Sequence, residues 1–234
     1  GGTPFLELLV LQLRSQGVRR VVLCTGYLAD QINERFDDGR KWGVAIGYSN
    51  EPYPLGTAGA VKFAEAYLEQ DTEFLVMNGD SFLEVDLRQL ISFHRKHGGL
   101  MTMAVRRIAE AARYGTVEVN KDGRVISFAE KTAARIPGII NGGVYVFNHD
   151  VLRNITEGPV SFERDVFPLL LEQGVYALEQ HGMFIDIGTP EDYARAQELY
   201  GSLAEAALPK AKSAPSDPHE ATASCANSIK DTVR

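Results

Sequence analysis

The chain has 234 residues, of which 44% are hydrophobic and 24% are charged, with a formal net charge of −7 at neutral pH. This composition is typical of a globular protein, and the length accommodates one large α/β domain with appendages. The charge is acidic, with no stripe of clustered Lys and Arg. It argues against nucleic acid as a partner, because binding to a phosphate backbone needs such clusters.

No apolar run approaches the roughly 20 residues that span a bilayer, so we expect no membrane association. The start, Gly1-Gly2-Thr3-Pro4, has no basic region followed by an apolar one and gives no sign of a signal peptide. The two cysteines, Cys24 and Cys225, form no disulfide framework and fit a reducing compartment. We therefore expect a cytoplasmic protein.

In the first half of the chain, segments with helical and strand-like patterns alternate. We predict helices over Phe5 to Ser15, Leu28 to Phe36, Thr57 to Leu68 and Asp86 to His97, and strands over Arg20 to Thr25, Val44 to Tyr48 and Phe74 to Met77. Thr57 is the expected N-cap of its helix. Such alternation favours right-handed βαβ units around a mostly parallel central sheet.

The loop from Glu51 to Ala60 leads into one of these helices and contains Gly56 and Gly59. Small residues let a flat ligand approach the backbone, and free N–H groups at a helix start can bond to its edge. The alternative is a helix start that packs tightly on the sheet. The loop matches neither a Walker loop nor a G-x-G-x-x-G fingerprint.

The apolar run Phe74 to Met77 is typical of a strand buried on both faces, and Asn78-Gly79-Asp80 follows it directly. In open α/β sheets, ligands bind beyond the carboxyl ends of the strands, so we expect Asp80 at the mouth of a crevice. A carboxylate there can hold Mg²⁺ beside phosphates. The alternative is an Asp that only shapes a turn.

The second half of the chain is rich in strand-like segments. We predict strands over Met101 to Arg106, Thr116 to Val119, Val125 to Phe128, Val144 to Phe147 and Met183 to Ile187, and turns at Tyr114-Gly115, Asn120 to Gly123 and Asn141-Gly142-Gly143. Thr189, followed by Pro190 and two acids, predicts a helix that begins there and runs to about Tyr200.

Three charged residues of this half are candidates for chemistry. Asp186 lies inside an apolar strand, where an acid is costly to bury unless it has a partner such as a metal shared with Asp80. The alternative is a carboxylate that caps a nearby turn. Glu130 and Lys131 end a strand, where Lys131 can meet a phosphate and Glu130 can accept sugar hydroxyls. The alternative for these two is a solvated ion pair.

From about Ser202 onward the composition shifts to Ala, Ser, Pro and Lys, and no apolar periodicity survives. We expect residues 1–201 to form the folded domain. Residues 202–234 are expected to form a disordered tail or linker.

The order of these pieces over residues 3–200 resembles the sugar-1-phosphate nucleotidyltransferases. The matching pieces are Pro54 to Ala60, Asn78 to Asp80, Arg113 to Val117, Glu130-Lys131, Asn141 to Tyr145 and Phe184 to Tyr193. Within the family the chain is most similar to the guanylyltransferases of mannose 1-phosphate or D-glycero-α-D-manno-heptose 1-phosphate. The run Ser161 to Pro168 adds to the likeness with the heptose enzymes. The resemblance implies a Rossmann-like three-layer α/β/α fold with a smaller antiparallel sugar-binding part.

The resemblance also implies roles for the matching positions. Asp80 and Asp186 would hold Mg²⁺ and, with Lys131, would be catalytic. The nucleotide, by resemblance GTP, would lie against Leu55, Gly56, Thr57, Ala58, Gly59, Asn78 and Gly79. The sugar 1-phosphate would be held by Tyr114, Gly115, Glu130, Lys131, Asn141 and Gly142.

In the implied reaction, the sugar 1-phosphate oxygen attacks the α-phosphorus of the nucleotide and pyrophosphate leaves, without a covalent protein nucleophile. Catalysis of this kind consists mainly of in-line positioning and charge neutralisation. The product would be a nucleotide sugar for surface polysaccharide such as lipopolysaccharide. A homo-oligomer is compatible with the sequence.

The chain departs from the family pattern in two places. Thr132 follows Glu130-Lys131 where the family usually has Pro, which should only loosen the turn. In the family, an apolar strand, a Gly-rich loop with an Arg and a Pro-Lys-Pro segment precede the stretch that Gly1 to Glu7 resembles. We expect this chain to lack them, as a truncated product or as a short form without catalysis. A missing central strand should expose neighbouring strand edges, so we also expect low stability or aggregation.

Two other functions stay open. A non-catalytic sensor or regulatory subunit would bind nucleotide sugars without pyrophosphate chemistry. A metal-dependent glycosyltransferase would usually show Asp-x-Asp at the metal strand, whereas here the residues are Asp80-Ser81-Phe82. The choice of base, the choice between heptose and mannose, and the oligomeric state do not follow from the sequence.

Overall fold

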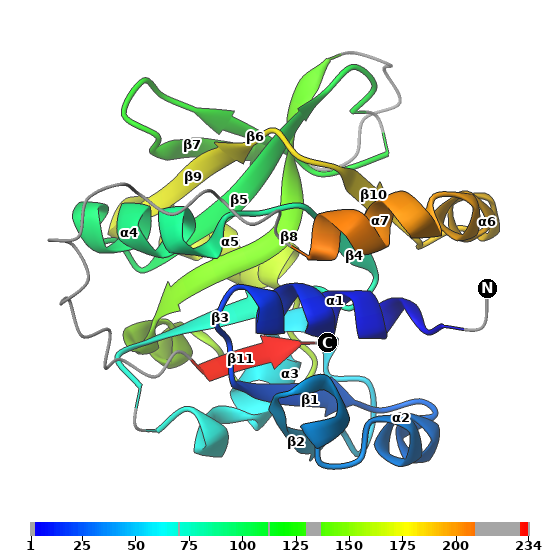
Figure 1. Cartoon of the computed structure of the whole chain (residues 1–234). Helices are drawn as coiled ribbons and strands as arrows, with labels where there is room; N and C mark the ends of the chain where they lie inside the picture. Colours follow the sequence, from blue (N-terminus) through cyan, green and yellow to red (C-terminus); the bar gives the residue numbers. More distant parts are fainter. Residues whose placement is uncertain (1–2, 70, 112, 130–136, 209–229, 234) are drawn as a thin grey trace, which may run out of the picture.

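The computed structural model describes residues 3–69, 71–111, 113–129, 137–208 and 230–233. In this part of the chain, a nine-stranded sheet contains the strands β2-β1-β11-β3-β8-β5-β9 in that order, and β6 and β7 join it through β8 (Figure 1). A separate two-stranded sheet consists of β10 and β4. Figure 1 shows the β6–β7 pair at one end of the molecule and the β1–β2 pair at the other.

The strands are β1 (Arg20–Thr25), β2 (Ala45–Asn50), β3 (Glu73–Met77), β4 (Ser81–Leu83), β5 (Met101–Ile108), β6 (Thr116–Val119), β7 (Val125–Ala129), β8 (Gly138–Asn148), β9 (Val175–Gln180), β10 (Phe184–Asp186) and β11 (Lys230–Val233). The α-helices are α1 (Phe5–Ser15), α2 (Ala29–Phe36), α3 (Gly56–Phe63), α4 (Leu87–His97), α5 (Phe167–Leu170), α6 (Pro190–Glu198) and α7 (Tyr200–Ala207). Short turns of other helix types are η1 (Arg40–Trp42), η2 (Glu65–Tyr67), η3 (His149–Asn154), η4 (Phe162–Val166) and η5 (Leu171–Gln173).

The α/β class is confirmed, but the main sheet is mixed rather than mostly parallel. Neighbouring strands from β2 to β3 are parallel, whereas β8 runs antiparallel to both β3 and β5. The connection from β5 to β8 contains the β6–β7 hairpin, and β8 then returns antiparallel along β5. The alternation in the first half of the chain could not reveal this reversal, because it belongs to the second half.

β11 lies between β1 and β3 and pairs with both in parallel, in register with Val21 to Leu23 on one side and with Phe74 to Met77 on the other. The strand edges that we expected to be open are therefore paired in this structure. The stretch 202–234, expected to be a disordered tail, contains most of α7 and all of β11, while residues 209–229 and 234 lie outside the described residues.

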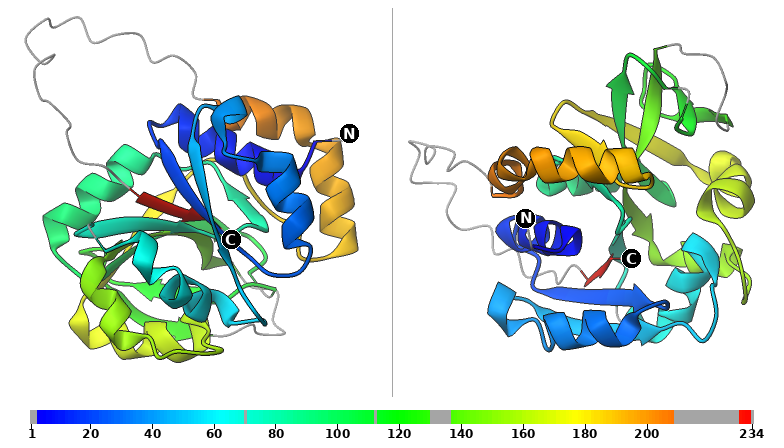
Figure 2. Two further views of the ribbon diagram at one scale, coloured as in Figure 1. Left: turned by 90° about the horizontal axis from the view of Figure 1, so that it is seen from below. Right: turned by 90° about the vertical axis from the view of Figure 1, so that its right-hand side faces the viewer.

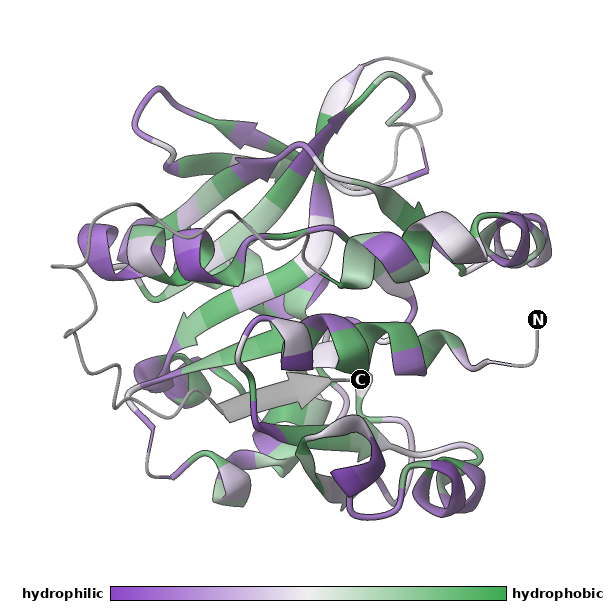
Figure 3. Cartoon of the chain, viewed as in Figure 1, coloured by the Kyte–Doolittle hydropathy of each residue, from purple (hydrophilic) through white to green (hydrophobic). Residues whose placement is uncertain are grey.

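β3 is buried on both faces, as the apolar run predicted. Phe74 and Val76 belong to one apolar cluster and Leu75 and Met77 to another. This follows from the alternation of side chains along a strand, which sends successive residues to opposite faces of the sheet. Figure 3 shows the result, with hydrophobic residues concentrated in the central strands and hydrophilic residues on outer helices such as α2 and α6.

Helices cover both faces of the sheet. Apolar residues of α1, α4 and α7 join the cluster of Leu75, whereas those of α3, η4 and α5 join the cluster of Phe74. α1 and α7 lie side by side, as both views of Figure 2 show. The Gln12 amide of α1 donates a hydrogen bond of 2.7 Å to the Leu83 carbonyl oxygen and so fixes α1 to β4.

Two helix starts and one turn agree with their predictions. Asp86 caps α4 by accepting from the Gln89 N–H at 3.0 Å, and Thr189 caps α6 by accepting from the Asp192 N–H at 3.2 Å. In the predicted hairpin turn, the Gly123 N–H donates to the Asn120 carbonyl oxygen at 3.1 Å. Among the described residues, no helix is both long and apolar enough to cross a bilayer.

Candidate active site

Asp80 and Asp186 come together at one end of the β4–β10 ladder. Asp80 is exposed in the turn that links β3 to β4, and Asp186 is the last residue of β10. Ser81 pairs with Asp186, and the Ile187 N–H donates to the Asp80 carbonyl oxygen at 2.8 Å. The two residues are therefore neighbours across the ladder, as the sequence hypothesis of a shared site requires.

The Asp186 carboxylate also has a local contact, because its Oδ1 accepts from the Gly188 N–H at 2.9 Å. This is the turn-capping contact of the alternative interpretation. A carboxylate has two oxygens, and only Oδ1 takes part in this bond, so turn capping does not prevent metal binding.

Asn141-Gly142-Gly143 forms a bulge inside β8 rather than the turn that we predicted. The pairing with β5 shifts register here, because Ala104 pairs with Val144 and the next residue, Val105, pairs with Asn141. Gly143 has φ +74°, and a Cβ on Gly142 would lie 2.4 Å from the Leu83 side chain, so both positions need glycine.

The bulge holds the Asp80 loop directly. The Asn78 N–H donates to the Gly143 carbonyl oxygen at 2.8 Å, and the Gly143 N–H donates to Asn141 Oδ1 at 3.0 Å. Asn78 belongs to the predicted nucleotide residues and Asn141 to the predicted sugar-phosphate residues. Gly143 therefore links the two residues through one hydrogen bond to each.

Tyr114 and Gly115 lie beside the same bulge. The Asn141 N–H donates to the Gly115 carbonyl oxygen at 3.3 Å, and the Tyr114 ring meets Phe184 of β10 edge-on at 5.5 Å between centroids. Burial raises the pKa of Tyr114, the nearby Arg113 charge opposes this, and the negative charge of Asp186 adds to the rise. Tyr114 thus stays protonated and can donate a hydrogen bond close to Asp186.

An ion pair between Arg113 and Asp192 ties the Tyr114 loop to the start of α6. Asp192 Oδ2 also accepts from the Thr189 hydroxyl at 2.7 Å. The Thr189 hydrogen bond, followed by the Arg113 contact, lowers the pKa of Asp192 although partial burial opposes it. Sequence reasoning did not find this pair, because its partners are 79 positions apart.

The start of α3 is packed against residues 158–163. The N–H groups of Ala58 and Gly59 donate to the Val160 carbonyl oxygen at 3.0 and 3.1 Å. A Cβ on Gly59 would lie 2.2 Å from the Gly158 carbonyl oxygen. At these two positions the glycine and the N–H groups serve tight packing, so our expectation that they are free for a ligand is wrong.

Thr57 does not cap α3, because the helix begins at Gly56 and Leu55 holds the N-cap position. The Thr57 hydroxyl instead accepts from the Phe162 N–H at 2.8 Å and donates to Glu163 Oε2 at 3.2 Å. Thr57 therefore joins the predicted nucleotide segment to η4. The partner segment lies more than 100 residues away in the chain, which explains why a local capping rule failed.

Glu163, which the sequence analysis did not select, contacts the predicted nucleotide segment through Thr57. Its Oε2 accepts from the Thr57 and Ser161 hydroxyls. Burial raises the pKa of the Tyr145 phenol, and the negative charge of Glu163 adds to the rise. The run Ser161 to Pro168 was noted only as a family likeness. The feature that could have pointed to Glu163 is that it is an exposed acid within this run.

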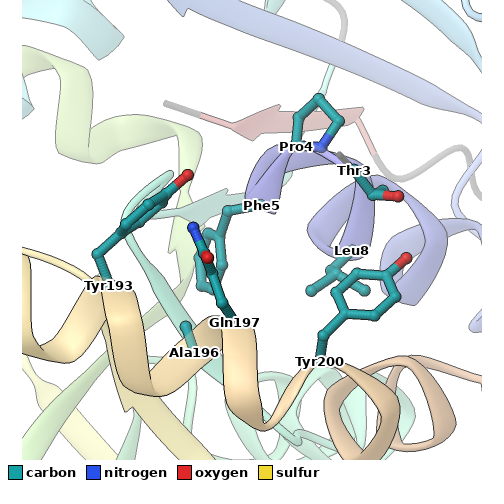
Figure 4. Close-up of a pocket in the computed structure, with 8 residues that line it drawn as sticks. All are labelled: Thr3, Pro4, Phe5, Leu8, Tyr193, Ala196, Gln197 and Tyr200. Atoms are coloured by element: carbon teal, nitrogen blue, oxygen red, sulfur yellow. The ribbon is translucent and has the colours of Figure 1, made fainter. Parts of the chain in front are cut away.

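The cavities in the described part of the chain include one at the start of α3 and one beside α1. The larger, about 630 Å³, touches Leu55 and Gly59 at the start of α3 and also contacts Lys62, Phe63 and His149. The smaller, about 260 Å³, lies between α1 and α6–α7, where Tyr193, Gln197 and Tyr200 face Phe5 and Leu8 (Figure 4). The lining of the smaller one contains no predicted site residue.

The remaining predicted residues, Glu130 and Lys131, lie outside the described residues. Within the described part of the chain, no group of three or more His, Cys, Asp or Glu side chains could hold a metal ion. The Asp80–Asp186 pair fits Mg²⁺ nevertheless, because Mg²⁺ typically takes one or two carboxylates and fills its other positions with water and substrate phosphates.

Comparison with known proteins shows the family of the chain. A family model described as "Nucleotidyl transferase" matches residues 1–202. The mannose-1-phosphate guanylyltransferase catalytic subunit beta of Drosophila pseudoobscura pseudoobscura is 37% identical over 203 residues, which cover 85% of this chain and 55% of that protein. The mannose-1-phosphate guanylyltransferase of Mycobacterium tuberculosis is 37% identical over 198 residues, which cover 83% and 55%.

Among solved structures, HddC from Yersinia pseudotuberculosis superposes with a TM-score of 0.76 at 32% identity, covering 85% of this chain and 86% of that chain. A second structure of HddC, complexed with GMP-PN, matches equally well. The chain spans about half the length of the curated relatives that it matches.

Proposed function

The chain belongs to the nucleotidyl transferase family, and from this premise we propose that its site transfers a guanylyl group from GTP to a sugar 1-phosphate of the mannose or manno-heptose type. The oxygen of the sugar phosphate forms a bond to the α-phosphorus. The bond from that phosphorus to the bridging oxygen breaks, and pyrophosphate leaves with the electron pair. The product is a GDP-sugar.

One observation supports this proposal most strongly: the β4–β10 ladder and the β8 bulge bring the two predicted halves of the site together. The backbones of Asp80 and Asp186 lie at the same end of the ladder, and the Asn78 N–H is bonded to Gly143 of the bulge. A phosphate acceptor and a phosphate donor must be held in line, and a site that joins both binding regions can do so.

We assign the roles accordingly. Asp80 and Asp186 would hold Mg²⁺, which neutralises charge on the phosphates when bound. Asn141, Gly142, Tyr114 and Gly115 would orient the sugar 1-phosphate, with Glu130 accepting sugar hydroxyls and Lys131 pairing with the phosphate.

On the nucleotide side, residues Leu55 to Gly59 with Asn78 and Gly79 would contact the nucleotide. Ala58 and Gly59 use their N–H groups internally, so their contribution is the surface against which the nucleotide lies.

The base and sugar are proposed from the relatives. The Mycobacterium and Drosophila proteins are mannose-1-phosphate guanylyltransferases by name, and HddC has been crystallised with GMP-PN. GTP is therefore the expected donor. We keep mannose 1-phosphate and D-glycero-α-D-manno-heptose 1-phosphate as the two acceptors to be compared, in the synthesis of nucleotide sugars for surface polysaccharide.

Two matched substitutions test the proposal. Asp80→Asn and Asp186→Asn each remove one negative charge at nearly constant shape, and each should lower Mg²⁺-dependent turnover of GTP and sugar 1-phosphate by about 100-fold or more. Asp122→Asn, the same change in the exposed β6–β7 turn, should leave turnover within about 2-fold. Full turnover in Asp186→Asn would refute the two-carboxylate metal site.

The same assay separates the alternative, a protein that binds nucleotide sugars without catalysis. Such a protein would bind GDP-mannose in calorimetry and release no pyrophosphate in any variant. Hydrolysis of GDP-mannose without exchange with pyrophosphate would instead indicate a glycosyltransferase-like activity.

A further inference from the structure

The Tyr145 hydroxyl lies at the junction of the two halves of the site, although no substrate can reach it. Tyr145 has no exposed surface and lies in β8, where it pairs with Val76 of β3 and Met103 of β5. Its hydroxyl accepts from Asn141 Nδ2 at 2.6 Å.

These contacts form a chain of hydrogen bonds. The Asn78 N–H donates to the Gly143 carbonyl oxygen, the Gly143 N–H donates to Asn141 Oδ1, and the Asn141 amide donates to Tyr145. This chain of bonds joins the loop that carries Asp80 to the bulge that carries Asn141. The Asn141 side chain is thus held both through its carbonyl oxygen and through its amide.

The Tyr145 ring is itself fixed by aromatic packing. Phe162 and Phe167 lie 6.2 and 5.4 Å from it between centroids, and Phe147 lies 5.8 Å away. Phe162 is the residue whose N–H is bonded to Thr57, so the packing also reaches the start of α3. A phenol held on three sides in a close-packed core has little freedom to move its hydroxyl.

We infer that Tyr145 is a positioning residue whose hydroxyl fixes the spacing between the Asp80 loop and the Asn141–Gly143 bulge. The inference rests on the proposed function, because the spacing matters for catalysis only if the site joins a sugar 1-phosphate to a nucleotide. The hydroxyl holds the metal-bearing loop and the sugar-phosphate-bearing bulge in one arrangement, so that acceptor and donor phosphates meet in line. Displacements of about 1 Å in such a site can cost about 100-fold in rate.

The first test measures amide hydrogen exchange in Tyr145→Phe, which keeps the ring and removes only the hydroxyl. The Asn78 and Gly143 N–H groups should exchange at least about 10-fold faster than in the unmodified chain. Tyr48→Phe is the matched control, because the Tyr48 hydroxyl donates to the Asp37 carbonyl oxygen, outside this chain of hydrogen bonds. Unchanged exchange at Asn78 and Gly143 would overturn the inference, whether or not the chain is active.

The second test measures steady-state kinetics with GTP, Mg²⁺ and sugar 1-phosphate. In Tyr145→Phe, kcat should fall by about 10- to 100-fold while the Kd of each substrate alone stays within about 3-fold. A purely structural role would lower the Tm and leave kcat unchanged well below it, which would overturn the inference. If the unmodified chain shows no turnover, the proposed function fails, and the exchange experiment still decides whether Tyr145 holds this chain of hydrogen bonds in place.

Discussion

The His94 imidazole lies in the core at the junction of α4 and β5, where its Nδ1 is 2.9 Å from the Thr102 hydroxyl. Burial lowers the pKa of His94, with Arg95 acting in the same direction and Glu73 opposing it. The folded chain therefore prefers neutral His94, whereas the unfolded chain takes up a proton near pH 6.5. The contribution of His94 to stability is complete above that pH and declines as the pH falls below it.

We predict that the free energy of unfolding falls more steeply between pH 7 and pH 5 in the unmodified chain than in His94→Gln, in which the buried titrating group is absent. Urea unfolding at several pH values measures the two slopes. His181→Gln, at an exposed histidine, is the control and should keep the original slope. Equal slopes for all three proteins would show that His94 is not the group responsible.

Some residues of the candidate site could be predicted because they stand next to an apolar strand in the sequence. Asp80 follows the apolar strand β3 and Asp186 ends the apolar strand β10, so the sequence marks both residues. Their proximity could not be derived from it, because it depends on the pairing of β10 with β4, a strand that we did not predict. The role of Thr57 could not be predicted, because it depends on Phe162 and Glu163, which the fold brings from a distant part of the chain. The Arg113–Asp192 ion pair could not be predicted either, because its partners are also far apart in the chain.

At the scale of elements, the start of α3 packs closely against residues 158–163, and this close packing requires glycine at position 59. Ala normally stabilises a helix relative to Gly by up to about 1 kcal/mol, but a Cβ at Gly59 would collide with the Gly158 carbonyl oxygen. Gly201 in α7 offers the contrast, because a Cβ there would meet nothing within 4 Å. The same substitution should therefore have opposite effects in the two helices.

We predict that Gly59→Ala lowers the free energy of unfolding by about 1–3 kcal/mol through overpacking, whereas Gly201→Ala raises it by up to about 1 kcal/mol. Chemical denaturation of both variants under one set of conditions measures the difference. A stabilising effect of Gly59→Ala would mean that residues 158–160 do not pack on α3 as described.

Most helices and strands of the described chain were predictable, because their apolar residues repeat with the period of a helix or alternate along a strand. The β8 bulge was not, since Asn141-Gly142-Gly143 has the composition of a turn. Only the register against β5 shows that the strand continues through it. β9 and η4 were also missed, because short amphipathic segments carry too few apolar residues to define a period.

At the scale of the whole molecule, β11 connects the β1–β2 pair to the rest of the main sheet. β1 and β3 both pair with β11 and not with each other. Loss of β11 would leave two parallel edges facing each other without partners in the middle of the sheet, and unpaired edges favour aggregation. The sequence could not place this strand, because its polar composition resembles the rest of the tail.

We predict that deletion of residues 230–234 lowers the free energy of unfolding by more than about 1 kcal/mol, because the backbone hydrogen bonds on both sides of β11 are lost. Thermal unfolding and light scattering measure stability and aggregation. Deletion of residues 217–221, which removes the same length and leaves β11 in the chain, is the control. If the two deletions behave alike, β11 does not support the sheet.

The measurement that tests the central claim most directly is pyrophosphate release by this chain with Mg²⁺, GTP and, in separate reactions, mannose 1-phosphate, D-glycero-α-D-manno-heptose 1-phosphate or glucose 1-phosphate. We predict release with a manno-configured sugar, no release without sugar, and loss of release in Asp186→Asn. Absence of release with every sugar, in a folded chain that still binds GDP-mannose, would contradict guanylyl transfer and indicate a nucleotide-sugar-binding protein.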